Sequence, residues 1–289
     1  MVSDLVCNYC GRQFRGGERA ALDDIWELYM DKKQSIADIA ESYNVSVSTI
    51  KRKLRKIEMP WEQPNIAGSG YVHFDVTYWG HNWGVILAVD HDSGKAIYLD
   101  FISPEKAEDY LRALQSIKSR GFVIKGVIID GFRALFDIFS DYKIQMCHFH
   151  MKQIVTRYLT GNPRLQASKE LAAIVERLTK LDKVAFTQEY ADWNARWHTV
   201  LCERTVSMDT GKWCYTHKKL RTAVNSLNYY MEYLFTYLSP ECVGMPNTNN
   251  MIEGLFSALK KRLNVHAGMK EDSRKRFIKG FFKALNNGK

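Results

Sequence analysis

Apolar and polar residues alternate in short runs through the middle of the chain, and this pattern predicts a sheet. The sequence His91-Asp-Ser-Gly94 has the composition of a turn between two such runs. A helix is predicted after Pro104, where apolar residues recur at helical spacing, and a short one near 132–139. The predicted strands lie at 71–79, 83–90, 95–101, 122–129 and 143–147.

The order of these elements predicts the topology of the sheet. Three strands joined by short turns form antiparallel pairs, and a helix before the fourth strand makes that strand parallel to the first. This is the order of an RNase H-like domain, in which the first and fourth strands are neighbours. We therefore expect an α/β fold with a mixed five-stranded sheet.

A separate helical pattern precedes the sheet and has the rhythm of a helix-turn-helix. Ser46 is suited to cap its last helix, in which Val47, Ile50 and Leu54 form the expected buried stripe. A recognition helix places polar residues on base edges and cations near phosphates. The predicted DNA-contacting residues are Ser48, Thr49, Lys51, Arg52 and Arg55. The alternative is a solvated helix in a small bundle.

Changes in composition divide the chain into six expected segments. A Pro- and Gly-containing linker separates the helix-turn-helix from the sheet, and a helical stretch with few strand signals interrupts the RNase H-like domain. The segments are a partial zinc-ribbon-like knuckle at 1–19, the helix-turn-helix module at 20–60, the linker at 61–70, the first part of the RNase H-like domain at 71–150, an all-α insertion at 151–245, and a helix containing Glu253 with a basic C-terminal helix at 246–289.

Positive charge is concentrated near the end of the chain. The chain has 41 Lys and Arg against 32 Asp and Glu, and positions 260–289 contain ten of the former and two of the latter. Such a cluster suits the phosphate backbone of nucleic acid, although a solvated helix face is the alternative. The residues expected to hold backbone phosphates are Lys260, Lys261, Arg262, Arg274, Lys275 and Arg276.

The six cysteines are scattered and do not form the pattern of a disulfide framework. Only Cys7 and Cys10 have the spacing of zinc ligands, and a tetrahedral site needs a second pair. A Zn²⁺ site at this knuckle and two free thiols both remain open. No long apolar run or signal peptide is evident, so we expect a cytoplasmic protein that does not bind a membrane.

Three widely spaced carboxylates carry the strongest chemical signal. Asp75 stands inside an apolar strand, Asp130 ends the run Val127-Ile-Ile-Asp130, and Glu253 begins a basic helix. Buried acids need a compensating charge, and oxygen ligands favour Mg²⁺ or Mn²⁺. Each acid also has an ordinary explanation, since aspartates are common in turns and a glutamate suits a helix start.

The contexts of these acids together resemble one family. The chain from about 71 to 268 resembles the DDE transposases of bacterial insertion sequences related to the Mutator elements. The resemblance rests on the Asp75 strand with its hairpin, on Val127-Ile-Ile-Asp130, and on Thr248-Asn-Asn-Met-Ile-Glu253. A Cys-x-x-His motif, here Cys147-His-Phe-His150, lies between the second and third acids as in the family.

This resemblance implies a function. Asp75, Asp130 and Glu253 would be a catalytic triad that holds two Mg²⁺ or Mn²⁺ ions, within an RNase H-like domain interrupted by the all-α insertion. The activity would be cleavage at element ends and strand transfer to target DNA, by a dimer or larger assembly in the bacterial cytoplasm at the nucleoid. For Cys147 and His150, metal binding, shaping of the site and DNA contact all remain open.

Two rival functions are retained. A decayed or domesticated transposase would bind specific DNA without catalysis, and an RNase H-like nuclease would cut DNA without strand transfer. The presence of all three acids favours the enzyme over the first rival. Detection of joined product distinguishes it from the second.

Overall fold

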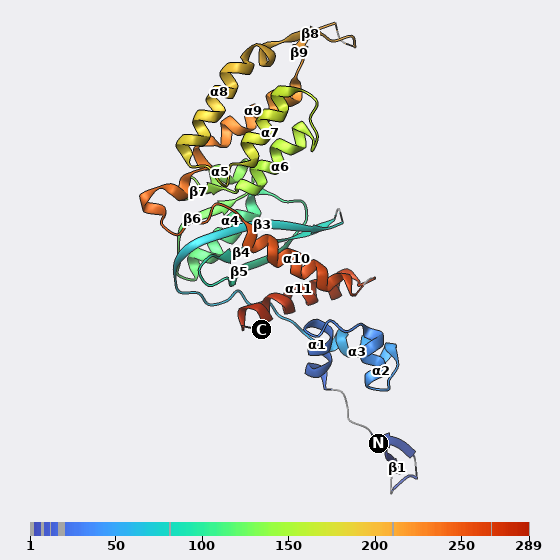
Figure 1. Ribbon diagram of the computed structural model, residues 1–289. Coiled ribbons are helices and arrows are strands. Elements are labelled where there is room, and N and C mark those ends of the chain that lie inside the picture. The colour runs from blue at the N-terminus through green and yellow to red at the C-terminus, as the bar shows by residue number, and fades with distance from the viewer. Residues whose placement is uncertain are drawn as a thin grey trace. The chain divides into compact units, whose positions relative to one another are not determined.

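The computed structural model describes residues 3–6, 9–11, 13–16, 21–80, 82–209, 211–266 and 268–288 (Figure 1). The chain divides into two compact units. The larger unit is Gln63–Gly254, and the smaller unit combines Met1–Glu62 with Leu255–Lys289.

A five-stranded mixed sheet forms the centre of the larger unit. Its strand order is β5-β4-β3-β6-β7, with antiparallel pairing of β3 to β4 and of β4 to β5, and parallel pairing of β6 to both β3 and β7. The first and fourth strands of the sheet are neighbours, so the predicted RNase H-like order is confirmed. The strands are β3 (Gly68–Trp79), β4 (Trp83–Asp90), β5 (Ala96–Ile102), β6 (Phe122–Ile129) and β7 (Lys143–Met146).

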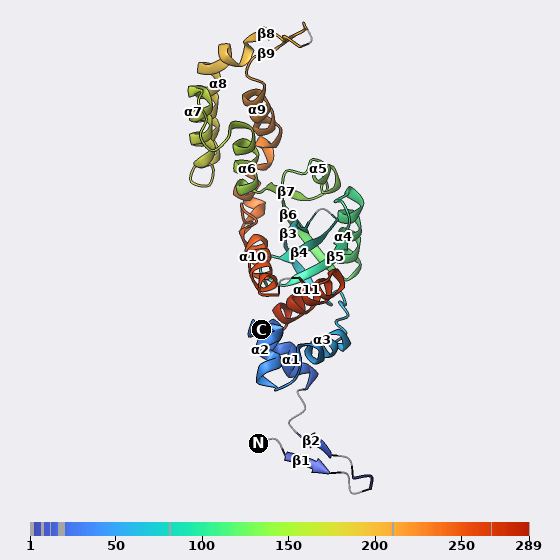
Figure 2. The same cartoon turned by 90° about the vertical axis from the view of Figure 1, so that its right-hand side faces the viewer.

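The two faces of this sheet are covered differently. Helices α4 (Ala107–Ser119) and α5 (Ala134–Ile138) contribute to the main core, together with Val72 and Phe74 of β3. The alternate residue Tyr71 belongs to a second buried cluster with Ile128, Cys147, Cys242 and Met245. Figure 2 shows α4 on one side of the sheet and the start of α10 (Asn250–Asn264) on the other. Period-two alternation therefore directs Asp75 toward the face that carries α10.

The insertion between β7 and α10 is helical apart from one hairpin. A short pair of antiparallel strands joins the third and fourth helices of the insertion. The predicted all-α segment did not include these strands. The helices are α6 (His148–Leu159), α7 (Gln166–Glu176), α8 (Lys183–Cys202) and α9 (Lys218–Tyr230); the hairpin strands are β8 (Arg204–Val206) and β9 (Trp213–Tyr215); three 3₁₀ turns follow at Met231–Tyr233, Thr236–Leu238 and Pro240–Cys242.

Three helices near the N-terminus of the chain, α1 (Leu22–Met30), α2 (Ile36–Ser42) and α3 (Val47–Lys56), form the predicted helix-turn-helix arrangement. Ser46 caps α3, since its hydroxyl accepts a hydrogen bond from the Thr49 N–H at 3.2 Å. Ile50 and Leu54 are buried as expected, but the prediction for Val47 is wrong because this residue is 40% exposed. Val47 is the first residue of α3, at the open end of the apolar stripe.

Helix α11 (Glu271–Asn286) packs within the same unit as the helix-turn-helix. The ring of Phe277 lies 5.7 Å from that of Tyr29, and the Arg276 guanidinium donates to the Leu54 carbonyl at 3.0 Å. Arg262 forms an ion pair with Asp31 at 3.7 Å. Two residues expected to contact phosphates are therefore engaged in contacts within the protein.

The remaining basic residues differ in exposure. Lys260 and Lys261 are exposed, as are Ser48, Lys51, Arg52 and Arg55 on α3. Lys275 forms an ion pair with Glu271 at 2.6 Å, and Arg274 donates to the Met269 carbonyl at 3.4 Å. The cations most available to a polyanion are thus those of α3 and of the second half of α10.

The N-terminal residues form an antiparallel pair of strands, β1 (Ser3–Val6) and β2 (Gln13–Gly16). Cys7 lies outside the described residues, and Cys10 has an exposed, free thiol. The zinc site at this pair stays a prediction. In the described part of the chain, no helix combines the length and apolar character needed to cross a membrane.

Candidate active site

Strands β3 and β6 bring the first two predicted acids together. They pair in parallel with His73 opposite Ile128, and continuing this register by two residues places Asp75 beside Asp130. The Asp75 carboxylate accepts a hydrogen bond from the Val76 N–H at 2.8 Å. Asp130 follows the last residue of β6 and accepts from the Phe132 N–H at 2.9 Å.

The loop after Asp130 is fixed by the insertion. The hydroxyl of Tyr230, a buried residue of α9, donates to the Gly131 carbonyl at 2.7 Å. The same residue stacks at a tilt on Phe136 of α5, with ring centroids 5.2 Å apart. Through these contacts, the insertion holds in place the loop that follows Asp130.

Glu253 joins the other two acids from the first turn of α10. Burial, together with the negative charges of Asp130, Glu253 and Glu105, raises the pKa of Asp75 to about 8. Burial also raises the pKa of the Glu253 carboxyl. The acids thus lie close enough for their charges to interact, although the sequence separates Asp130 from Glu253 by the whole insertion.

These acids fit a divalent cation. They crowd negative charge into partly desolvated surroundings, and the Oε1 atom of Glu253 is buried without a hydrogen-bond partner. Carboxylate oxygens are the ligands that Mg²⁺ and Mn²⁺ prefer. A cation held by Asp75, Asp130 and Glu253 would neutralise the charge that now raises the pKa of Asp75.

The tightest set of possible ligands includes only one of the three acids. Across the described residues, one group of three donor side chains lies with all donor atoms within 4.8 Å of one another, namely Cys147, His150 and Glu253. His150 Nε2 lies 3.8 Å from Glu253 Oε1. Asp75 and Asp130 are not part of so close a group.

Asn249 links the elements that carry the acids. This fully buried residue accepts from His73 Nδ1 at 2.8 Å through its Oδ1, and its Nδ2 donates to the Phe74 carbonyl at 3.1 Å. Its backbone N–H donates to Cys147 Sγ at 3.2 Å. Burial lowers the pKa of His73 to about 4, so the ring is neutral and its Nε2 accepts from His91 Nδ1 at 3.0 Å.

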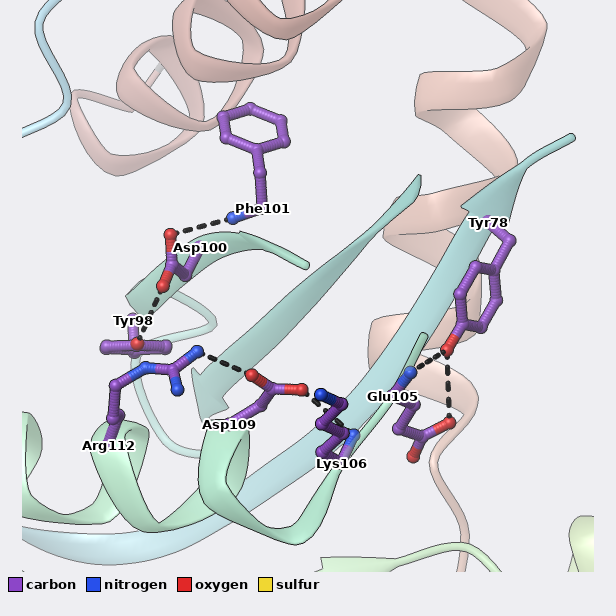
Figure 3. Close-up of polar contacts among 8 residues, drawn as sticks. All are labelled: Tyr78, Tyr98, Asp100, Phe101, Glu105, Lys106, Asp109 and Arg112. Atoms are coloured by element: carbon purple, nitrogen blue, oxygen red, sulfur yellow. Dashed lines mark hydrogen bonds and ion pairs between the residues drawn. The ribbon is translucent and has the colours of Figure 1, made fainter. Parts of the chain in front are cut away.

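Sequence reasoning did not identify Glu105, which lies just before α4. Its carboxylate accepts from the Tyr110 hydroxyl at 2.5 Å. Its N–H donates to the Tyr78 hydroxyl at 3.0 Å, as Figure 3 shows. Burial is the largest cause that raises the pKa of the Glu105 carboxyl, and the negative charge of Asp130 raises it further. No local pattern marks Glu105 as functional, and its position after Ser103-Pro104 resembles an ordinary helix start.

The start of α4 holds Glu105 in place. The Asp109 carboxylate accepts from the Lys106 N–H at 2.9 Å and from the Arg112 guanidinium at 2.5 Å (Figure 3). This contact caps the first turn of the helix. The backbone immediately after Glu105 is therefore fixed, and its side chain is oriented by Tyr78 and Tyr110.

Comparison with known proteins identifies one part of the chain. Residues 15–56 match the family model of the helix-turn-helix domain of resolvase. No curated protein matches the chain. Solved structures similar to the chain include the Drosophila P element transposase strand transfer complex, at 10% identity and a TM-score of 0.42 over 95% of this chain and 93% of that one. They also include the simian T-cell lymphotropic virus intasome with the PP2A regulatory subunit B56 gamma, at 14% identity and a TM-score of 0.23 over 71% and 68%.

Proposed function

We propose that this chain is a DDE-type DNA transposase that cleaves phosphodiester bonds at element ends and joins the freed 3′-hydroxyls to target DNA. The observation that carries this proposal is the convergence of Asp75, Asp130 and Glu253 at neighbouring elements of an RNase H-like sheet. The family resemblance of the segments around these acids supports the same conclusion.

The acids act by holding charge at fixed positions. Asp75 projects from a central strand and Asp130 from the end of its neighbour, so the rigid sheet sets their separation. Bound Mg²⁺ or Mn²⁺ would supply the positive charge that activates the attacking hydroxyl and stabilises the leaving oxygen. Both cleavage and joining are in-line displacements at phosphorus, and they need no nucleophile from the protein.

DNA binding is assigned to the helix-turn-helix and to nearby cations. Ser48, Lys51 and Arg52 are exposed on α3, the helix that would enter the major groove at the terminal inverted repeats. Lys260 and Lys261 would contact backbone phosphates without sequence preference. Because two element ends must be joined in one reaction, we expect a homodimer or larger assembly on DNA.

Metal-dependent cleavage tests this function. Incubated with labelled DNA that flanks the coding sequence, the purified chain should nick inverted-repeat ends in Mg²⁺ or Mn²⁺ and give joined products with a target plasmid. Chelation by EDTA should abolish both products, because the acids lack the cation that compensates their charge. Undiminished cleavage in EDTA would contradict the proposal. Cleavage without joined product favours the nuclease, and specific binding without cleavage favours the DNA-binding rival.

Replacement of Glu105 tests whether the fourth carboxylate belongs to this site. We expect Glu105→Gln to raise the Mg²⁺ concentration required for half-maximal cleavage severalfold, since the substitution removes a negative charge that interacts with Asp75 and Asp130. The matched control is Glu108→Gln, an exposed glutamate three residues further along. Identical Mg²⁺ dependence of the two variants would show that Glu105 has no part in metal binding.

A further inference from the structure

A second set of possible metal ligands lies at the start of α6. Cys147 is the N-cap residue of this helix, His150 lies in its first turn, and Glu253 approaches from α10. Their donor atoms lie within 4.8 Å of one another. Three ligands around one Zn²⁺ ion are separated by roughly 3.3–3.8 Å, given metal–ligand bonds of about 2.0–2.3 Å. The 3.8 Å between His150 and Glu253 is already of this size.

One ligand atom of this set lacks a hydrogen-bond partner. Glu253 Oε1 is buried and unpaired, and His150 Nε2 lies 3.8 Å from it, which is too long for a hydrogen bond. A buried unsatisfied polar atom costs on the order of 1–3 kcal/mol. Such atoms persist in native proteins chiefly where an ion, water or ligand completes them.

The sulfur of Cys147 is surrounded by donors. Its Sγ accepts from the N–H of Asn249 at 3.2 Å, and the backbone N–H groups of Phe149 and His150 also stabilise the thiolate. Burial acts in the opposite direction and raises the pKa of the thiol to about 11. The thiolate form of Cys147 is therefore favoured only when a cation binds beside the buried sulfur, because a bound metal displaces the thiol proton.

The chemistry of the donors selects the metal. Sulfur and imidazole are poor ligands for Mg²⁺ but good ligands for Zn²⁺ and Co²⁺. We propose that Cys147, His150 and Glu253 form a zinc-type site, distinct from the carboxylate site but sharing Glu253 with it. The coupling between the sites, though not the zinc-type site itself, rests on the function proposed above.

Sharing Glu253 makes the two sites antagonistic. One carboxylate cannot fully neutralise two dications, and two dications a few ångströms apart repel each other. Zn²⁺ at Cys147 and His150 would therefore weaken Mg²⁺ binding by Asp75 and Asp130. By linkage, Mg²⁺ would weaken Zn²⁺ binding by the same factor. The geometry thus points to inhibition of the Mg²⁺-dependent reaction by Zn²⁺.

Cobalt spectroscopy tests the site without DNA. The full chain carrying Cys7→Ser and Cys10→Ser should bind one equivalent of Co²⁺ and show a thiolate-to-cobalt charge-transfer band. Adding Cys147→Ser should remove the band, and adding His150→Gln should lower Co²⁺ affinity by at least about tenfold. The matched control is Cys202→Ser, which removes an exposed thiol 3.5 Å from His198 Nε2 and should leave the band unchanged.

The results separate this inference from the proposed function. A band that survives Cys147→Ser, or no band at millimolar Co²⁺, overturns the site; if Cys147→Ser does not fold, the His150→Gln titration decides. In cleavage assays, equimolar Zn²⁺ should raise the Mg²⁺ requirement of the wild type but not of Cys147→Ser, and equal responses overturn the coupling. A chain that shows the band but cleaves no DNA refutes the proposed function alone.

Discussion

Replacing Asp75 by asparagine is expected to lower metal-dependent cleavage by on the order of 10³-fold or more, the scale of losing one member of a catalytic set. The same change is expected to stabilise the metal-free protein. The gain arises because burial and the charges of three other carboxylates make an ionised Asp75 unfavourable in the folded state.

The sign of the pH dependence follows from the two states of Asp75. Its pKa is about 8 in the folded protein against an ordinary value of 3.8, so between these values the folded state retains a proton that the unfolded state has released. Stability therefore falls as pH rises, and the loss is complete above pH 8. A shift of this size corresponds to at most about 5–6 kcal/mol over the whole range, of which the interval from pH 6.5 to 8.5 covers at most about 2 kcal/mol.

Urea unfolding in EDTA at pH 6.5 and 8.5 measures this effect. Between these values the wild type should lose about 1 kcal/mol of stability relative to Asp75→Asn. Buried histidines such as His73 and His148, whose pKa values burial lowers to about 4, gain stability across this window as their unfolded rings lose protons, but they do so equally in both proteins and cancel in the comparison. Asp141→Asn, at an exposed turn, is the control. Equal pH profiles for wild type and Asp75→Asn would contradict the burial of an unpaired charge.

The sheet and two of its acids were predictable because their signals are local. Strand periodicity and turn composition specify the order of the elements, and that order alone makes β3 and β6 neighbours, which places Asp75 beside Asp130. The cap at Ser46 is likewise a short-range signal. Glu253 needed the family resemblance, because nothing in its own turn distinguishes a ligand from an acid that suits a helix start.

The features that the sequence did not reveal depend on tertiary contacts. Glu105 is held by the tyrosines at 78 and 110, and only the folded chain brings it near enough for the charge of Asp130 to raise its pKa. Arg276 has the sequence context of a phosphate contact, but the packing of α11 directs it to the Leu54 carbonyl. Charge and periodicity identify which residues could bind DNA or a metal. The contacts that these residues make are set by packing between distant segments of the chain.

Asn249 offers the clearest test of how the site is held together. Its side chain and backbone connect β3, the start of α6 and the start of α10, and the residue is fully buried. We expect Asn249→Ala to lower the free energy of unfolding by about 2–4 kcal/mol, because the His73 ring and the Phe74 carbonyl would each lose a buried hydrogen bond.

The same substitution is expected to lower the cleavage rate while DNA affinity stays near the wild-type value. Asn249 touches none of the three acids through its side chain, but it fixes the helix that begins with Glu253 to the strand that carries Asp75. Asn250→Ala, at the exposed neighbouring position, is the matched control and should change stability by only a few tenths of a kcal/mol. Cleavage kinetics, a DNA-binding titration and urea unfolding of both variants measure these effects.

Two outcomes would refute this role for Asn249. If Asn249→Ala and Asn250→Ala were equally stable, the buried bonds to His73 and Phe74 would not contribute to the fold. If Asn249→Ala were destabilised but cleaved DNA at the wild-type rate under folding conditions, the helix of Glu253 would be positioned by other contacts. A fall in rate at constant DNA affinity is the signature of misplaced acids, because substrate binding depends on other residues while the reaction depends on the separation of the carboxylates.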